Sequence, residues 1–151
     1  MSNNVENISK IAQMLDDAFE RKDIDGCLSC FTEDAAIEFM GVKLEGKTNI
    51  KRWMNWIQSI LSEVKFQARI IMVESDKLFE EYVLIGTTND GETITSNQSE
   101  ILEFEDEKIK KLRIYFDRLD FVKCLKGRLA GTIAGYVKKQ SEKWLESSRA
   151  D

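Results

Sequence analysis

Apolar residues in the first part of the chain recur every three or four positions, which is the period of an α-helix. The first such stripe predicts an amphipathic helix over about Val5–Lys22, and its members are Ile8, Ile11, Ala12, Leu15, Ala18 and Phe19. Asp23 or Asp25 can cap a second, short helix that runs through Phe31. A longer stripe predicts a third helix, with Thr48 as its N-cap, on which the apolar residues are Ile50, Trp53, Met54, Ile57, Ile60, Leu61 and Val64.

Elsewhere apolar and polar positions alternate, which is the pattern of β-strands with two different faces. The predicted strands cover residues 35–40, 42–45, 65–75, 78–88, 93–105 and 108–117. Turns are expected at Asp76–Lys77, Asn89–Gly91 and Asp106–Glu107. The last two strands would therefore form one long antiparallel ribbon.

The end of the chain returns to a helical pattern. Asp117 is placed to cap a short helix over Arg118–Leu125, and Gly127 is placed to end it. Residues 128–151 predict a further helix. The whole order predicts an α+β domain in which helices gather on one face of an antiparallel sheet.

Composition excludes several classes of function. A chain of 151 residues has the length of one domain, and its net charge of −5 argues against nucleic acid as a partner. No apolar run approaches the roughly 20 residues that a membrane span needs. The first residues lack the pattern of a signal peptide, so a cytoplasmic location is expected.

The absence of histidine narrows the chemistry further, because it excludes Ser–His and Cys–His nucleophiles and histidine-based metal sites. Cys27-x-x-Cys30 has a spacing found in zinc and redox motifs. A zinc site would need further ligands, the third thiol is the distant Cys124, and no proline is present to complete a thioredoxin-like site. We interpret the pair as small, reduced core residues. No metal site and no cofactor motif is predicted.

Two segments resemble a known family. Phe31-Thr32-Glu33-Asp34-Ala35, after a pair of helices, is similar to the F-x-x-D-A segment that begins the sheet of NTF2-like proteins. Tyr115-Phe116-Asp117, before a short amphipathic helix, resembles the end of SnoaL-like (polyketide cyclase-like) members. The resemblance covers residues 5–127 and leaves 128–151 as a C-terminal helical extension.

This resemblance implies a cone, in which the sheet wraps against three helices around an internal, mostly apolar pocket. It also implies a homodimer formed through the sheet. Members of the superfamily include ketosteroid isomerases, polyketide cyclases, epoxide hydrolases, dehydratases and binding proteins, so a shared fold does not fix the function.

The catalytic positions of the isomerases are mostly lost when their pattern is placed on this chain. The general base falls at Phe39, the tyrosine donor at Leu15 and the protonated aspartate at Glu100. A phenyl ring cannot abstract a proton. The aspartates of an epoxide-hydrolase relay cannot be placed on inward positions, although Arg69 could pair with Glu100 if the strand register allowed it.

Glu100 is the candidate acid or base. Gln98 and Ser96 lie on the same face of its strand, and burial there would raise the pKa of the carboxyl group. The alternative is that this face becomes solvated towards the strand end. The residues expected to line a ligand-binding pocket are Leu15, Phe39, Trp53, Gln98, Leu112, Ile114 and Phe116. For Trp53 a place in the core is the alternative, and Trp56 is expected at the pocket mouth or a subunit contact.

Three hypotheses for the function follow. The first is a binding protein for a small apolar molecule, without a catalytic set. The second is a cyclase, isomerase or hydratase that uses Glu100 as acid or base. The third is a protein-docking module that uses the sheet as its docking surface, and a pocket filled by Trp53 and Phe39 would favour it.

Overall fold

The structure is a computed structural model that describes residues 2–124 and 128–147. The chain divides into two compact units, with the boundary between Phe116 and Asp117.

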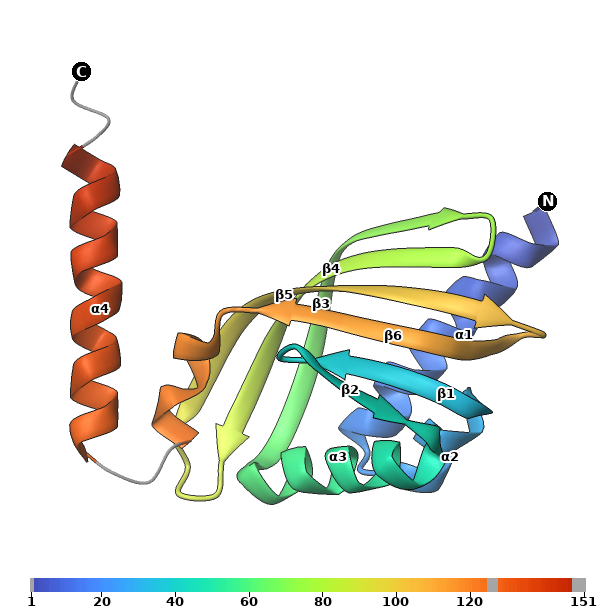
Figure 1. The fold of residues 1–151 in the computed structure, drawn as a ribbon, viewed down its shortest axis with the longest axis horizontal. Helices are drawn as coiled ribbons and strands as arrows, with labels where there is room; N and C mark the ends of the chain where they lie inside the picture. Colours follow the sequence, from blue (N-terminus) through green and yellow to red (C-terminus); the bar gives the residue numbers. More distant parts are fainter. Residues whose placement is uncertain (1, 125–127, 148–151) are drawn as a thin grey trace. The chain divides into compact units, whose positions relative to one another are not determined.

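The first unit contains three helices and a six-stranded sheet (Figure 1). Along the chain the elements are α1 (Ser2–Glu20), α2 (Ile24–Ser29), β1 (Phe31–Phe39), β2 (Val42–Glu45), α3 (Gly46–Ile60), β3 (Leu61–Glu74), β4 (Lys77–Thr88), β5 (Thr93–Glu105) and β6 (Lys108–Phe116). The spatial order of the strands is β2-β1-β6-β5-β4-β3. This confirms the predicted α+β fold with a curved sheet and helices.

The sheet is antiparallel with one exception, because β1 and β6 run parallel. The order of the elements in the sequence had predicted an antiparallel sheet. A parallel pair needs a long connection, and here it consists of everything from β2 to β5. The hairpin of β1 and β2 is therefore joined to the other strands of the sheet through β6.

The third helix differs from its prediction at both ends. It begins at Gly46 and has Glu45 in the N-cap position without a side-chain cap, so Thr48 is not the cap. It ends at Ile60, and Leu61 and Val64 belong to β3, where both are buried. The apolar stripe continued across the boundary because the same buried surface receives both the last helical turn and the first strand residues.

The second helix begins as predicted. The Gly26 N–H donates a hydrogen bond to the Asp23 carboxylate at 2.8 Å, which identifies Asp23 rather than Asp25 as the N-cap. This contact supplies an acceptor for one of the four N–H groups that a helix start leaves unpaired.

The predicted hairpin turns lie at or beside their expected places. Asp106 and Glu107 form the tip between β5 and β6 with φ values of 48° and 59°, as a two-residue type I′ connection requires. The turn between β3 and β4 is at Ser75–Asp76, one residue earlier than predicted. Gly91, with φ of 86°, follows β4 in the turn that leads to β5.

The core of the first unit lies between the helices and the sheet. One apolar row crosses four strands in register, from Ile37 through Leu112 and Leu102 to Leu78, and none of these residues is more than 2% exposed. Helix α3 packs on β1, and α1 packs on β3 and β4. We call this face the helix-facing side of the sheet.

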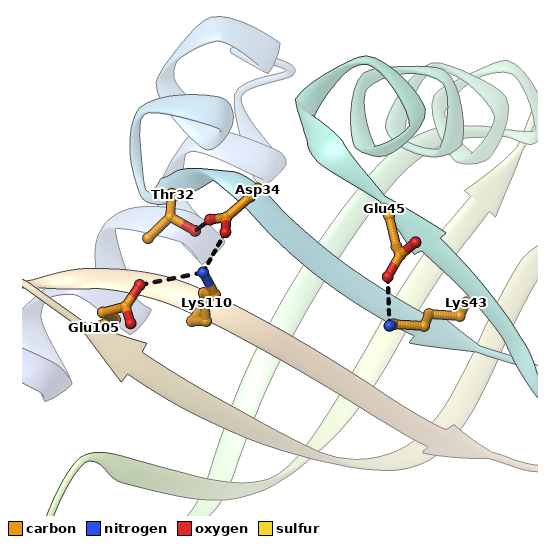
Figure 2. Close-up of polar contacts among 6 residues, drawn as sticks. All are labelled: Thr32, Asp34, Lys43, Glu45, Glu105 and Lys110. Atoms are coloured by element: carbon orange, nitrogen blue, oxygen red, sulfur yellow. Dashed lines mark hydrogen bonds and ion pairs between the residues drawn. The ribbon is translucent and has the colours of Figure 1, made fainter.

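Several charged side chains form ion pairs on the surface of β1, β2, β5 and β6. Lys110 on β6 contacts Asp34 on β1 at 2.5 Å and Glu105 on β5 at 3.2 Å, and Lys43 pairs with Glu45 on β2 (Figure 2). Exposed pairs of this kind add little stability, about 0–1 kcal/mol each.

Arg69 also takes part in a surface pair. Its guanidinium lies 3.9 Å from the Glu81 carboxylate. The anticipated pair of Arg69 with Glu100 is therefore wrong, because the strand register places Glu81 and not Glu100 beside the arginine.

The second unit consists of a 3₁₀-helix, η1 (Arg118–Cys124), and the C-terminal helix α4 (Arg128–Ser147). The Leu119 N–H donates to the Asp117 carboxylate at 2.8 Å, so the predicted cap is confirmed. Asp120 pairs with Lys138 of α4. Gly127, the predicted end of the short helix, lies outside the described residues. None of the described helices is long and apolar enough to cross a membrane.

Truncating the apolar row should destabilise the first unit. We expect Leu102→Ala to lower the free energy of unfolding by about 2–5 kcal/mol, because it leaves a cavity where four strands and the helices meet. Val42→Ala, at a position that is 57% exposed, should change it by less than about 0.5 kcal/mol. Urea unfolding followed by circular dichroism measures both values, and equal effects would contradict this placement of the core.

Candidate functional site

A band of polar side chains crosses the helix-facing side of the sheet beside the apolar row. Glu80 on β4 lies opposite Glu100 on β5, and Tyr82 lies opposite Gln98 in the next pair on the same face of the sheet. Ser96 follows on the same face of β5. Their exposed fractions are 3%, 6%, 4%, 6% and 1% in that order. Burying so many polar groups together is costly unless each finds a partner.

Apolar side chains border this band. Ile114 on β6 lies opposite Glu100, and Phe116 lies opposite Gln98. Phe39 on β1 is in register with Ile114, so one row runs from Phe39 through Ile114 and Glu100 to Glu80. The position of the isomerase base is thus occupied by a ring, and the same row carries carboxyl groups two and three strands away.

Helix α1 contributes a third carboxyl group, Asp16, which is partly buried. Its pKa is raised to about 9, first because burial disfavours the charged form and then because Glu100 and Glu80 repel it. Helix α1, which carries Asp16, packs on β3 and on β4, the strand of Glu80.

The two glutamates are shifted in the same direction. The pKa of Glu100 is raised to about 8, first by burial and then by repulsion from Glu80, while the hydrogen bond from Tyr82 acts in the opposite direction. Burial alone raises the pKa of Glu80. Glu80 therefore acts on both of the other carboxyl groups, and the pKa values of all three are raised above their usual range.

The Tyr82 hydroxyl group connects two residues of β5. It donates to Gln98 Oε1 at 3.0 Å and to Glu100 Oε2 at 3.3 Å. Because a hydroxyl group has a single proton, the two acceptors share it. Donation to the Glu100 carboxylate favours its ionised form, which is why this contact lowers the pKa of Glu100. Burial, Glu100 and Asp16 together raise the pKa of Tyr82 well above its usual range.

A continuous series of aromatic rings borders the polar band. Phe39 contacts Trp53, Trp56 and Phe116, with ring centroids 5.3, 6.3 and 5.1 Å away. Phe19 contacts Trp53 at 6.4 Å and Phe66 at 5.9 Å. Phe66 in turn meets Tyr82 at 5.5 Å.

Several polar atoms of this region have no partner. Ser96 Oγ and Trp53 Nε1 are buried without a hydrogen bond. Within residues 2–124 and 128–147, the side chains of Asp16 and Glu80 make neither a hydrogen bond nor an ion pair. Such groups can bind the polar part of a ligand, since native interiors rarely leave them unpaired.

The arrangement favours proton-donating and hydrogen-bonding chemistry. In the described part of the chain, no group of three or more His, Cys, Asp or Glu residues could hold a metal ion. Cys27 and Cys30 are buried free thiols, and burial raises the pKa of Cys27 to about 12, as expected of unreactive core residues.

The predicted site residues fall into three groups. Glu100 and Gln98 lie in the polar band, with Ile114 and Phe116 beside them. Phe39 and Trp53 belong to the aromatic series. Leu15 and Leu112 are buried in the core, with exposed fractions of 6% and 2%.

Sequence reasoning missed Asp16, Glu80 and Tyr82. A signal for Asp16 was present, because it stands between Leu15 and Phe19 at the edge of the apolar stripe of its helix. Glu80 and Tyr82 lie two and four residues after Leu78 on β4, so they share the face of the strand that carries Leu78.

Comparisons with known proteins agree with this fold. A family model described as a SnoaL-like domain matches residues 11–112. No curated protein matches the chain.

Among solved structures, an NTF2-like protein of unknown function from Burkholderia pseudomallei is similar, with 14% identity and a TM-score of 0.72, over 80% of this chain and 98% of that one. TerC, co-crystallised with polyporic acid, has 18% identity and a TM-score of 0.71, over 80% and 99%. A protein described as a candidate polyketide cyclase from Sinorhizobium meliloti has 25% identity and a TM-score of 0.59, over 70% and 94%.

The raised pKa values make stability depend on pH. Because the folded state holds protons on Glu100 and Asp16 that the unfolded state releases, we expect the free energy of unfolding to fall as pH rises from about 5 to about 8. Glu100→Gln should reduce this slope by about one proton, or about 1.4 kcal/mol per pH unit. Urea unfolding at a series of pH values measures it.

Glu81→Gln, on the opposite face of β4, serves as the control and should keep the wild-type slope. An unchanged slope in Glu100→Gln would show that this carboxyl group does not keep its proton in the folded protein.

Proposed function

The chain belongs to the SnoaL-like domain family, and we propose that it binds a small, largely apolar molecule on the helix-facing side of its sheet. The observation that carries this proposal is the polar band of Glu80, Glu100 and Ser96, which has unpartnered groups and is bordered by apolar and aromatic side chains. A ligand with an apolar body and a single polar group matches both parts.

The physical argument rests on the cost of the free site. A buried polar group without a partner costs about 1–3 kcal/mol. A ligand that hydrogen-bonds to Ser96 or Trp53 recovers that cost, while its apolar body covers Phe39 and Ile114. Binding sites of this kind are apolar surfaces with a few convergent polar groups.

The relatives support the proposal. TerC shares the fold and was co-crystallised with polyporic acid. For this chain, the proposed contacts with the ligand are Phe39, Trp53, Gln98, Ile114 and Phe116, with Leu15 and Leu112 supporting them from the core.

We also infer that the protein is a cytoplasmic homodimer. Free cysteines agree with a reducing compartment. Ile70, Ile71 and Met72 on β3 are 46%, 48% and 58% exposed, which is unusual for three consecutive apolar residues on an edge strand. They provide a surface for the second subunit.

Loss of the central hydroxyl group should weaken ligand binding. We use 1-naphthol as a probe, because it combines an aromatic body with one hydroxyl group, and follow its titration by NMR of the backbone amides. Tyr82→Phe removes the hydrogen bond that orients Gln98, one of the proposed ligand contacts, and should raise the Kd about 2- to 10-fold, the range expected for one neutral hydrogen bond.

Tyr115→Phe, at a position that is 50% exposed, is the matched control and should bind like the wild type. Shifts confined to residues outside β4, β5 and β6 would contradict the proposed site.

A second candidate function is proton transfer, and the observation that favours it is the pair of buried carboxyl groups of Glu80 and Glu100, which lie opposite each other on neighbouring strands. Glu80 can take a proton from a carbon next to a carbonyl group. Glu100 can donate a hydrogen bond to the carbonyl oxygen as negative charge develops on it. Two acids with different protonation states in one site are the arrangement that such a reaction needs.

This function predicts hydrogen–deuterium exchange at the acidic carbon of a simple ketone. We expect the wild-type protein to accelerate exchange of 2-tetralone in D₂O, and Glu100→Gln to slow it by about 100-fold or more, which NMR detects directly. Glu103→Gln, a carboxyl group on the other face of β5, is the control. Exchange no faster than in buffer would reject proton transfer and leave binding intact.

A further inference from the structure

We infer that the molecule bound at this site is a small organic cation, in which a positively charged nitrogen lies against the carboxyl groups and the aromatic rings. The inference rests on the proposed function and specifies the class of its ligand.

The charge of the site supports a cationic ligand. The titratable groups that act on one another here come from α1, β4 and β5, and they are Asp16, Asp17, Glu20, Glu80, Tyr82 and Glu100. All of them are acids. No lysine or arginine is among the groups that shift the Asp16, Glu80 or Glu100 carboxyls.

The arginines of the neighbouring strands are engaged elsewhere. Arg113 on β6 pairs with Glu103 at 2.8 Å, and Arg69 pairs with Glu81. Both pairs involve residues that alternate with those of the polar band, so they lie on the other face of the sheet. A carboxylate or phosphate ligand would therefore face the acids of the polar band with neither of these arginines to neutralise its charge.

The aromatic series suits a cation for a separate reason. A ring carries negative charge on its faces, and alkylated ammonium groups bind among several rings. Phe39, Trp53, Phe19, Phe66 and Tyr82 contact one another in that order along the border of the acids. Methyl or methylene groups around a nitrogen can pack on the rings while the charge faces the carboxylates.

An independent observation points to a ligand in this place. Ser96 is 1% exposed, lies on the same face as Gln98 and Glu100, and leaves its hydroxyl group without a partner. The hydroxyl oxygen can accept a hydrogen bond from an ammonium or hydroxyl group of the ligand. A metal ion does not fit, because the described acids form no metal-binding group, whereas an organic cation can contact them at longer distances.

Protons take the place of the cation in the free protein. Without a counter-charge, Glu100 and Asp16 stay protonated at neutral pH, and a cation that binds would release those protons. The affinity for a cation of fixed charge should then rise with pH until both carboxyl groups are ionised.

The test uses a matched pair of compounds. Choline has a trimethylammonium group, and 3,3-dimethylbutan-1-ol has the same shape with carbon in place of nitrogen. Neither compound titrates in the range used, so any pH dependence comes from the protein. Amide NMR titrations at about pH 6 and about pH 9 give the Kd values.

We expect choline to bind at least about tenfold more tightly than the alcohol at about pH 9, and its Kd to fall at least about tenfold between the two pH values. The Kd of the alcohol should not fall. Glu80→Gln should remove the preference for choline, and Glu100→Gln provides a second variant if the first fails to fold. Glu81→Gln, on the opposite face of β4, should behave like the wild type.

Two outcomes would overturn the inference. Equal affinity for the two compounds would show that charge is not recognised, and the proposed binding function would stand. No response to choline at about pH 9 would also reject a cationic ligand. The titration with 1-naphthol would then decide separately whether the site binds small molecules.

Discussion

The main constraint on this structure is that it buries three interacting carboxyl groups and supplies no basic partner for them. Asp16, Glu80 and Glu100 come from a helix and two strands, and their repulsion would oppose folding if all were ionised. Protonation removes most of that repulsion, and the apolar row beside them supplies the packing that holds them together. The polar band is thus stable only because a well-packed core adjoins it, which is how strained functional groups persist in proteins.

Most of the architecture could be predicted from the sequence, since periodicity and turn residues act locally. The hairpin tip at Asp106–Glu107 and the cap at Asp23 are examples. The end of α3 could not be found in this way, because the apolar stripe runs on into Leu61 and Val64, and only tertiary packing decides where helix gives way to strand.

The site was harder to predict for a related reason. Strand alternation was enough to place Glu100 and Gln98 on one face. Bringing Glu80 opposite Glu100 required the register of β4 against β5, and a shift of one residue would have turned Glu80 away. Asp16 depended on how α1 lies on the sheet, which no local pattern contains.

The parallel pairing of β1 with β6 has a consequence for how the chain folds. Phe31 on β1 pairs with Ile109 on β6, which lies far from it in sequence. Contacts between residues so distant in sequence slow folding. During synthesis at about 5–20 residues per second, β1 waits on the order of ten seconds for its partner to be made. Until then one edge of its backbone is unpaired, and the nascent protein exposes Ile37 and Phe39 to chaperones or to other chains.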